Sequence, residues 1–340
     1  MASAEAVAAV VEAGGAHVPE LMRDLEARLA TIAQSHGSTL GEHAGATITA
    51  GGKRLRPLLV FVAAGPDPAG RGAALRAAVA VELVHSATLV HDDVLDAAVL
   101  RRGRPTVVAS AGRSIATATG DLLFSRAFAE LAGGGTVQPV RVLSDASSAL
   151  VQGELLQRED AWKLQTTRER YLRRCDLKTA RLFRAACELG ALAGANAPEH
   201  RAGDPPGLDR AGRVRLLGEF GERIGLAFQI LDDVLDVSGP AERTGKHRGT
   251  DLLDGTVTLP LILARERDAD VAELDLRAVR TPDQAEGVCD AIAATGALEA
   301  ARELALAMVA DAKADLPRLP EPSQQAALEL VADSVVDRYS

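Results

Sequence analysis

The sequence is poor in aromatic residues and has no excess of basic residues. Phe, Trp and Tyr make up 3% of its 340 residues, and 38 Lys and Arg are outnumbered by 47 Asp and Glu, for a formal net charge of −9. A nucleic-acid surface usually needs a basic stripe and stacking rings. The composition therefore argues against a nucleic-acid partner.

Cysteine is also sparse. Cys175, Cys187 and Cys289 show no CxxC spacing, and an odd, low count favours reduced, packed thiols over a disulfide framework. The N-terminal segment carries Glu5 and Glu12 with no basic region ahead of them, unlike a secretory signal. No long apolar run suggests a membrane span. These absences predict a cytoplasmic protein with no stable membrane anchor.

Short alternating runs typical of β-strands are almost absent as well. Ala, Leu, Arg and Glu recur at helical spacing instead, which predicts an all-α protein. Turn-forming clusters separate the helix-length segments, at residues 65–68, 133–135, 196–198, 204–207, 238–240 and 317–322. Because no cluster has the length of a linker, we expect one helical bundle domain over residues 1–340.

The most informative motif is Asp-Asp-Val-Leu-Asp, which occurs at residues 92–96 and again at 232–236. Its first and fifth carboxylates stack on one helix face, where they repel each other. Mg²⁺ relieves that repulsion, since it prefers carboxylates, waters and phosphate oxygens. The sequence thus predicts a magnesium-diphosphate site built from six aspartates: Asp92, Asp93, Asp96, Asp232, Asp233 and Asp236. A lone DxxxD is more often a solvated face or helix cap, but duplication disfavours that reading.

Basic residues lie close to both acidic motifs. Lys53 and Arg56 are three residues apart in the segment 51–57, Arg101 and Arg102 follow the first pentad, and Lys246 follows the second. Arg forks onto phosphate oxygens and Lys acts as a point charge. These residues are candidate diphosphate ligands, and local salt bridging is the alternative.

Three polar residues complete the candidate set. Lys178 and Thr179 are adjacent, and Gln229 lies one helical turn before the second pentad. Helix geometry directs Gln229 along the same face as Asp232 or Asp233. Each residue alone would be read as an ordinary core or surface polar group.

The motifs from Gly51-Gly52-Lys53-Arg54-Leu55-Arg56-Pro57 through Thr258-Leu259-Pro260 resemble the trans-isoprenyl diphosphate synthase family, also called polyprenyl synthetases, with a motif core at about residues 48–265. The resemblance implies an all-helical homodimer with a deep central cavity in each subunit. It also implies a Mg²⁺-dependent prenyltransferase, with three Mg²⁺ ions per active site when substrate is bound, that adds isopentenyl diphosphate to an allylic diphosphate.

The resemblance further implies a role for each candidate residue. Asp92, Asp96 and Asp232 would hold Mg²⁺, assisted by Asp93, Asp233 and Asp236. The positions matching isopentenyl diphosphate ligands are Lys53, Arg56, His85 and Arg102. Those matching allylic diphosphate ligands are Arg101, Lys178 and Lys246, and those lining the reacting carbons are Thr179 and Gln229. Such a reaction needs charge stabilisation at the departing diphosphate and no protein nucleophile.

One position departs from the family pattern. Where the family usually reads Gly-Lys-x-Thr-Leu-Pro, this chain has Thr256 in place of the lysine. A cationic contact to diphosphate is therefore missing, so that binding is weaker or the charge comes from another residue.

Product length depends on what faces the growing tail. If the tail runs along the helix of the first pentad, Val84, Ala87 and Thr88 form its wall, and none of them is aromatic. Phe124 and Phe128 are candidates for a deeper floor. The first pentad also lacks the two-residue insertion of common bacterial short-chain synthases. We therefore expect a linear trans-polyprenyl diphosphate of twenty carbons or longer.

Three alternatives stay open at this point. They are a short-chain farnesyl synthase, a class I terpene cyclase, and a non-catalytic subunit of a heteromeric synthase. The repeated aspartate motif disfavours a cyclase, whose second metal site normally has an Asn/Ser/Glu pattern, and the intact pentads disfavour a non-catalytic subunit.

Overall fold

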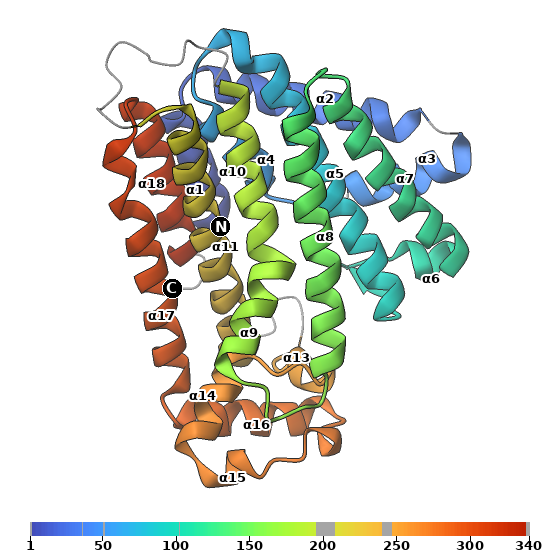
Figure 1. Cartoon of the computed structure of the whole chain (residues 1–340). Helices are drawn as coiled ribbons and strands as arrows, with labels where there is room; N and C mark the ends of the chain where they lie inside the picture. The colour runs from blue at the N-terminus through green and yellow to red at the C-terminus, as the bar shows by residue number, and fades with distance from the viewer. Residues whose placement is uncertain are drawn as a thin grey trace. The chain divides into compact units, whose positions relative to one another are not determined.

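The computed structural model describes residues 2–35, 37–49, 52–101, 103–194, 208–239 and 247–337. Helices dominate these ranges (Figure 1), and the strands within them form one antiparallel hairpin of β1 (Leu100–Arg101) and β2 (Arg104–Pro105). The predicted all-α class is confirmed. Turns expected at residues 65–68, 133–135 and 317–322 do separate helices, whereas those at 196–198 and 204–207 lie outside the described residues.

The chain divides into two compact units. Unit 1 comprises Met1–Ser147, Leu182–Gly221 and Leu316–Val331, and unit 2 comprises Ser148–Arg181, Glu222–Asp315 and Ala332–Ser340. Each unit is thus assembled from three separate stretches of sequence. The single domain with a central cavity stays a prediction.

Unit 1 is built around the long helix α5 (Arg71–Leu95). Its other helices are α1 (Ala2–Ala13), α2 (His17–Gln34), α3 (Ser38–Thr49), α4 (Leu55–Ala64), η1 (Pro68–Gly70), α6 (Val107–Ala111), α7 (Arg113–Ala132), η4 (Leu316–Arg318), the first parts of α8 (Val137–Asp160) and α11 (Arg210–Ser238), and most of α10 (Arg181–Gly194) and α18 (Pro322–Asp337). Helix α5 contacts α2, α3, α4, α6 and α7, and it runs beside α7 in Figure 1. Fully buried Leu58, Phe61 and Leu83 belong to this core.

The segment Pro68–Leu95, which contains α5, is long and apolar enough to cross a bilayer by length and composition, with a mean hydropathy of 1.5. This differs from the expectation that the chain has no long apolar run. However, 67% of that window is buried inside the structure, as in a core helix. The absence of a membrane anchor stays a prediction.

Unit 2 consists of shorter helices. They are α9 (Arg168–Cys175), the π-helical turn η2 (Asp176–Ala180), α13 (Thr250–Leu253), α14 (Leu259–Arg267), α15 (Ala269–Ala272), η3 (Leu276–Ala278), α16 (Pro282–Ala294), α17 (Ala297–Ala314), and the ends of α8, α11 and α18. Their starts follow local sequence rules: Thr167 caps α9, and Thr281 with Gln284 forms a capping box on α16.

The cysteines Cys175, Cys187 and Cys289 are free and buried, as predicted.

Candidate active site

The first pentad forms the last turn of α5 in unit 1. Asp92 is half-buried, Asp93 is 5% exposed, and Asp96 is exposed at the C-cap. The buried Asp93 carboxylate accepts a hydrogen bond from Nε of Arg101 at 2.7 Å. The hairpin that follows α5 thus returns Arg101 to the pentad, and the solvent-side positions of the motif are its first and fifth aspartates.

The partly open face of α5 continues upstream from the pentad. His85 and Thr88 are half-buried and lie two turns and one turn before Asp92, respectively, whereas Val84 and Ala87 are fully buried. His85 therefore shares a helix face with the first metal candidate, as its assigned role requires. The chain-length wall of Val84, Ala87 and Thr88 stays a prediction, with Thr88 its one member on the open face.

The basic segment before α4 is held in place by Arg54, which the sequence reasoning left unassigned. Its backbone is left-handed (φ 48°), and its guanidinium pairs with Glu26 at 2.7 Å and Glu82 at 2.5 Å. Such ion pairs compensate a strained backbone that a non-glycine residue seldom adopts. Arg54 thereby positions its neighbours Lys53 and Arg56.

Arg56 and Lys53 differ in their surroundings. Lys53 is exposed, whereas the Arg56 guanidinium lies 4.5 Å from the centroid of the Phe183 ring. Burial lowers the pKa of Arg56 to about 10, with the Glu82 carboxylate opposing that shift, so Arg56 is cationic at neutral pH. Its buried Nε has no hydrogen-bond partner among the described residues. A buried cationic donor without a partner suits an anionic ligand.

The second pentad lies near the end of α11, in unit 2. Asp232 is exposed, Asp233 is 5% exposed, and Asp236 is half-buried. Asp233 accepts hydrogen bonds from the Tyr171 hydroxyl at 2.7 Å and from Nε2 of Gln229 at 2.8 Å. The predicted direction of Gln229 along the face of Asp233 is confirmed.

The same network reaches η2. The Thr179 hydroxyl donates to Oε1 of Gln229 at 2.8 Å, so Thr179, Gln229, Asp233 and Tyr171 form one chain of hydrogen bonds. Burial raises the pKa of Asp233 to about 7, although its hydrogen bonds from Tyr171 and Gln229 and the charge of Arg174 act in the opposite direction. The carboxylate is thus desolvated and held by neutral donors.

Lys178 is fixed by residues of α8. Its ammonium donates to Oε2 of Glu154 at 2.5 Å and to Oε1 of Gln157 at 3.1 Å. The helices approach closely here, because a Cβ on Gly153 would lie 2.6 Å from the backbone nitrogen of Lys178. The π-helical turn can therefore pack this closely against α8 only because residue 153 is a glycine. Such π-helical turns often occur at functional sites.

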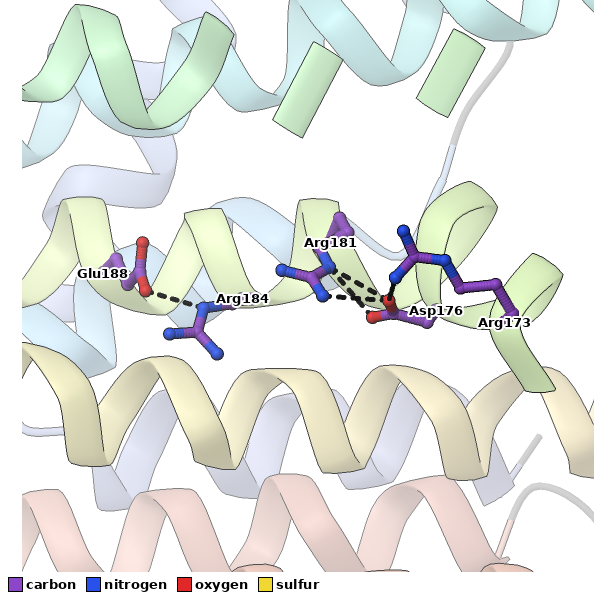
Figure 2. Close-up of polar contacts among 5 residues, drawn as sticks. All are labelled: Arg173, Asp176, Arg181, Arg184 and Glu188. Carbon is purple, nitrogen blue, oxygen red and sulfur yellow. Dashed lines mark hydrogen bonds and ion pairs between the residues drawn. The ribbon is translucent and has the colours of Figure 1, made fainter. Parts of the chain in front are cut away.

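An ion-pair cluster on unit 2 holds both ends of that turn (Figure 2). Asp176 accepts from Arg173 of α9 at 3.4 Å and from Arg181, which follows η2, at 2.9 Å. In unit 1, Figure 2 also shows the i, i+4 pair of Arg184 and Glu188 along α10, at 2.8 Å. The Asp176 pairs brace the turn that carries Lys178 and Thr179.

Lys178, Thr179, Gln229 and Asp233 border one cavity of about 180 Å³ within unit 2. It is lined by Gln157, Arg174, Cys175, Lys178, Thr179, Gln229, Asp233, Asp251, Thr256 and Thr258. The structure thus brings together the three residues predicted for the reaction centre and one pentad aspartate. Sequence reasoning missed Tyr171, Arg174, Glu154 and Gln157, which belong to none of the motifs recognised in the sequence, and it gave no role to Asp251.

Other predicted residues are not joined to this cavity. Arg102 and Lys246 lie outside the described residues, and the first pentad with Lys53, Arg56 and His85 belongs to unit 1. Convergence of the two pentads stays a prediction. Within the described ranges, no group of three or more His, Cys, Asp or Glu side chains is arranged to hold a metal ion.

Magnesium nevertheless fits the donors that are present. Mg²⁺ usually takes one or two protein carboxylates and completes its shell with waters and substrate phosphates. The half-buried Asp92 and the exposed Asp96 and Asp232 offer carboxylates with access to water. Each pentad, taken by itself, therefore suits magnesium bound with waters and substrate phosphates better than a closed protein cage.

Known proteins share both the sequence pattern and the fold. The family model "Polyprenyl synthetase" matches residues 38–295. The heptaprenyl diphosphate synthase component 2 of Geobacillus stearothermophilus is 42% identical over 240 residues, 71% of each chain. The geranylgeranyl diphosphate synthase of Methanosarcina mazei is 34% identical over 299 residues, 86% of this chain and 87% of that protein.

A solved structure agrees with these relatives. The polyprenyl synthase of Caulobacter crescentus, complexed with calcium and isoprenyl diphosphate, superposes with a TM-score of 0.84 at 33% identity, covering 97% of this chain and 98% of that one. The chain belongs to the polyprenyl synthetase family, and the predicted fold class and family are confirmed. Prenyl diphosphate synthase activity follows at the level of the class.

Proposed function

We propose that this protein condenses isopentenyl diphosphate with an allylic diphosphate, head to tail, to make a linear trans-polyprenyl diphosphate of twenty carbons or longer. The observation that carries the proposal is the unit 2 cavity, where Lys178, Thr179 and Gln229 meet Asp233 of the second pentad. It is a polar site with cationic and hydroxyl groups, suited to a diphosphate headgroup.

The proposal assigns Mg²⁺ to Asp92, Asp96 and Asp232, with Asp93, Asp233 and Asp236 assisting. When bound, Mg²⁺ supplies positive charge to diphosphate oxygens. The burial of Asp93 and Asp233 among protein donors supports their secondary role, because their carboxylates already accept hydrogen bonds.

The cationic residues hold the substrates. Lys53, Arg56, His85 and Arg102 bind isopentenyl diphosphate, and Arg101, Lys178 and Lys246 bind the allylic diphosphate. The partnerless Nε of Arg56 supports the first assignment, and the cavity position of Lys178 supports the second. On binding, Lys178 exchanges its Glu154 contact for phosphate oxygens.

Thr179 and Gln229 orient the reacting carbons. The C1–O bond of the allylic diphosphate breaks, the isopentenyl double bond forms the new C–C bond, and a proton leaves to the released diphosphate. Because the leaving group accepts that proton, the reaction requires no protein base. The hydrogen-bonded chain from Thr179 to Tyr171 keeps both side chains in fixed rotamers.

A cytoplasmic homodimer is the form we propose for the enzyme. Val151 and Leu155 are 57% and 58% exposed one turn apart on α8, and such apolar surface suits contact with a second copy. Three free, buried cysteines agree with a reducing compartment. A heteromeric enzyme is the second candidate, favoured by the 42% identity to a protein named as a synthase component.

Labelled isopentenyl diphosphate, offered with geranyl, farnesyl or geranylgeranyl diphosphate and Mg²⁺, tests the proposal. We expect incorporation by the purified chain and, by mass spectrometry, products of at least twenty carbons. Consumption of the allylic substrate without incorporation would indicate a cyclase instead. Activity that appears only with a second subunit would favour the heteromeric enzyme, and light scattering of the purified chain reports the dimer.

A further inference from the structure

Unit 2 buries an arginine that the predicted mechanism does not use. Arg174, on α9, is 4% exposed. Its Nη2 donates to the backbone oxygen of Val257 at 2.6 Å, and its guanidinium lies 5.4 Å from the centroid of the Tyr171 ring. Its Nη1 is buried and has no hydrogen-bond partner among the described residues.

This arrangement leaves a buried positive charge incompletely compensated. No carboxylate of the described residues lies within salt-bridge distance of Arg174, and the influence of its charge on Asp233 acts over a longer range. Burying an unpaired charge is costly, so buried cations are normally paired or bind a ligand. An anion held beside Arg174 would remove that cost.

The position of Arg174 indicates which anion that is. Arg174 borders the same cavity as Lys178 and Thr256. Its bond to Val257 fixes the guanidinium beside the segment 256–258, where the Gly-Lys-x-Thr-Leu-Pro pattern of the resembled family has a lysine in place of Thr256. The cation missing from that segment is thus matched by one that reaches it from α9, 83 residues away in sequence.

We propose that Arg174 is a diphosphate-binding residue that takes over the charge of the lysine replaced by Thr256. The inference rests on the proposed function, since the diphosphate is that of the allylic substrate. Nη1 of Arg174 donates to a phosphate oxygen while Nη2 keeps its bond to Val257, and Lys178 supplies a second cation to the same group.

The test exchanges charge between the two positions. Arg174→Gln keeps an amide donor for the Val257 oxygen but removes the charge. We expect the KM for the allylic diphosphate to rise about 10- to 100-fold, which is the effect of losing one charge-assisted hydrogen bond. The KM for isopentenyl diphosphate should change by less than about threefold, which is the size of the effect of a neutral surface substitution. In the double variant Arg174→Gln/Thr256→Lys, we expect most of that loss to be recovered.

A purely structural role predicts a different pattern. If Arg174 only anchors Val257, then Thr256→Lys gives no recovery, or both KM values rise together, and either result overturns the proposal. Arg174→Lys, which keeps the charge, should stay near the parent value and serves if Arg174→Gln folds poorly. Arg168→Gln is the matched control, because Arg168 is an exposed arginine at the start of the same helix.

Calorimetric binding of inorganic pyrophosphate with Mg²⁺ separates this inference from the proposed function. Weaker pyrophosphate binding in Arg174→Gln and its recovery in the double variant support the Arg174 assignment. They do so even if the parent chain incorporates no isopentenyl diphosphate, because that failure would count only against the proposed function. Equal pyrophosphate affinities in the parent and Arg174→Gln, together with normal incorporation by the parent, would reject the assignment alone.

Discussion

The two pentads are identical in sequence, and the second aspartate of each is 5% exposed, but the partners of these buried carboxylates differ. Asp93 pairs with the charged Arg101, eight residues along the chain. Asp233 accepts from the neutral Tyr171 and Gln229 instead, and the pKa of Asp233 is raised to about 7 by burial. Equal burial therefore has unequal electrostatic consequences.

The first aspartate of each motif is accessible to solvent. Asp92 is half-buried and Asp232 is exposed, so each remains accessible to a hydrated ion. We infer that the first aspartates share one role, whereas the electrostatic environment of each second aspartate is set by the residues packed against it. The experiments below test this division, from the largest expected effect to the smallest.

Removing either first aspartate should have the largest effect. We expect Asp92→Ala and Asp232→Ala each to lower kcat by about 100-fold or more, since each removes charge stabilisation of the diphosphate, while the melting temperature stays near that of the parent. Isopentenyl incorporation across a Mg²⁺ titration measures this. Asp145→Ala, an exposed change on α8, is the control. Unequal losses of kcat in the two variants would show that Asp92 and Asp232 do not share one role.

The second pentad also depends on the close approach of α8 to η2. Gly153→Ala inserts a methyl 2.6 Å from the Lys178 backbone nitrogen, and we expect about a tenfold or greater loss of kcat/KM from misplacement of Lys178 and Thr179. Gly287→Ala on α16 has nothing within 4 Å, so its activity should match the parent. Retained activity in Gly153→Ala would show that η2 tolerates displacement.

The two buried aspartates should differ in stability when neutralised. Asp93→Asn removes an ion pair in which Arg101 is 35% exposed, and after allowing for solvent screening we expect a loss of about 1–3 kcal/mol in the free energy of unfolding. Asp233→Asn should cost less, because it also removes a desolvated charge. Urea unfolding at pH 8 in EDTA measures both, and equal losses would contradict the proposed difference.

The pH dependence of stability sharpens the same contrast. The folded pKa of Asp233 (about 7) lies above its ordinary value of 3.8, so between these values the folded state holds a proton that the unfolded state has lost. This contribution to stability falls as pH rises from about 4 to about 7 and is then constant. The difference in unfolding free energy between parent and Asp233→Asn should follow that curve in EDTA. A pH-independent difference would refute the raised pKa.

The mildest expected effect concerns product length along the first pentad's helix. Thr88→Phe adds an aromatic ring on the partly open face of α5, and we expect shorter products at nearly unchanged total turnover. Ala87→Phe should also shorten products if that residue faces the tail, but Ala87 is fully buried, so overpacking should lower the melting temperature too. Mass spectrometry of the products distinguishes them, and an unchanged distribution in both variants would remove this wall.

Much of the site was predictable where one local rule applied. The aspartate spacing and the direction of Gln229 follow from helix geometry within one or two turns, and the hydrogen bond from Gln229 to Asp233 agrees. The structural role of Arg54 was not predictable, because its guanidinium joins Glu26 and Glu82, each 28 residues away. Whether residues so far apart in sequence meet depends on how the helices pack.

The sequence by itself determined the helical class, the duplicated aspartate motif and the family, because helical periodicity and motif spacing are local properties of the chain. Only the tertiary structure decided which groups surround those motifs. Tyr171 reaches Asp233 across 62 residues and Arg174 reaches Val257 across 83. These partners set the charge and pKa of the site through burial and distance, and both quantities exist only after the helices have packed.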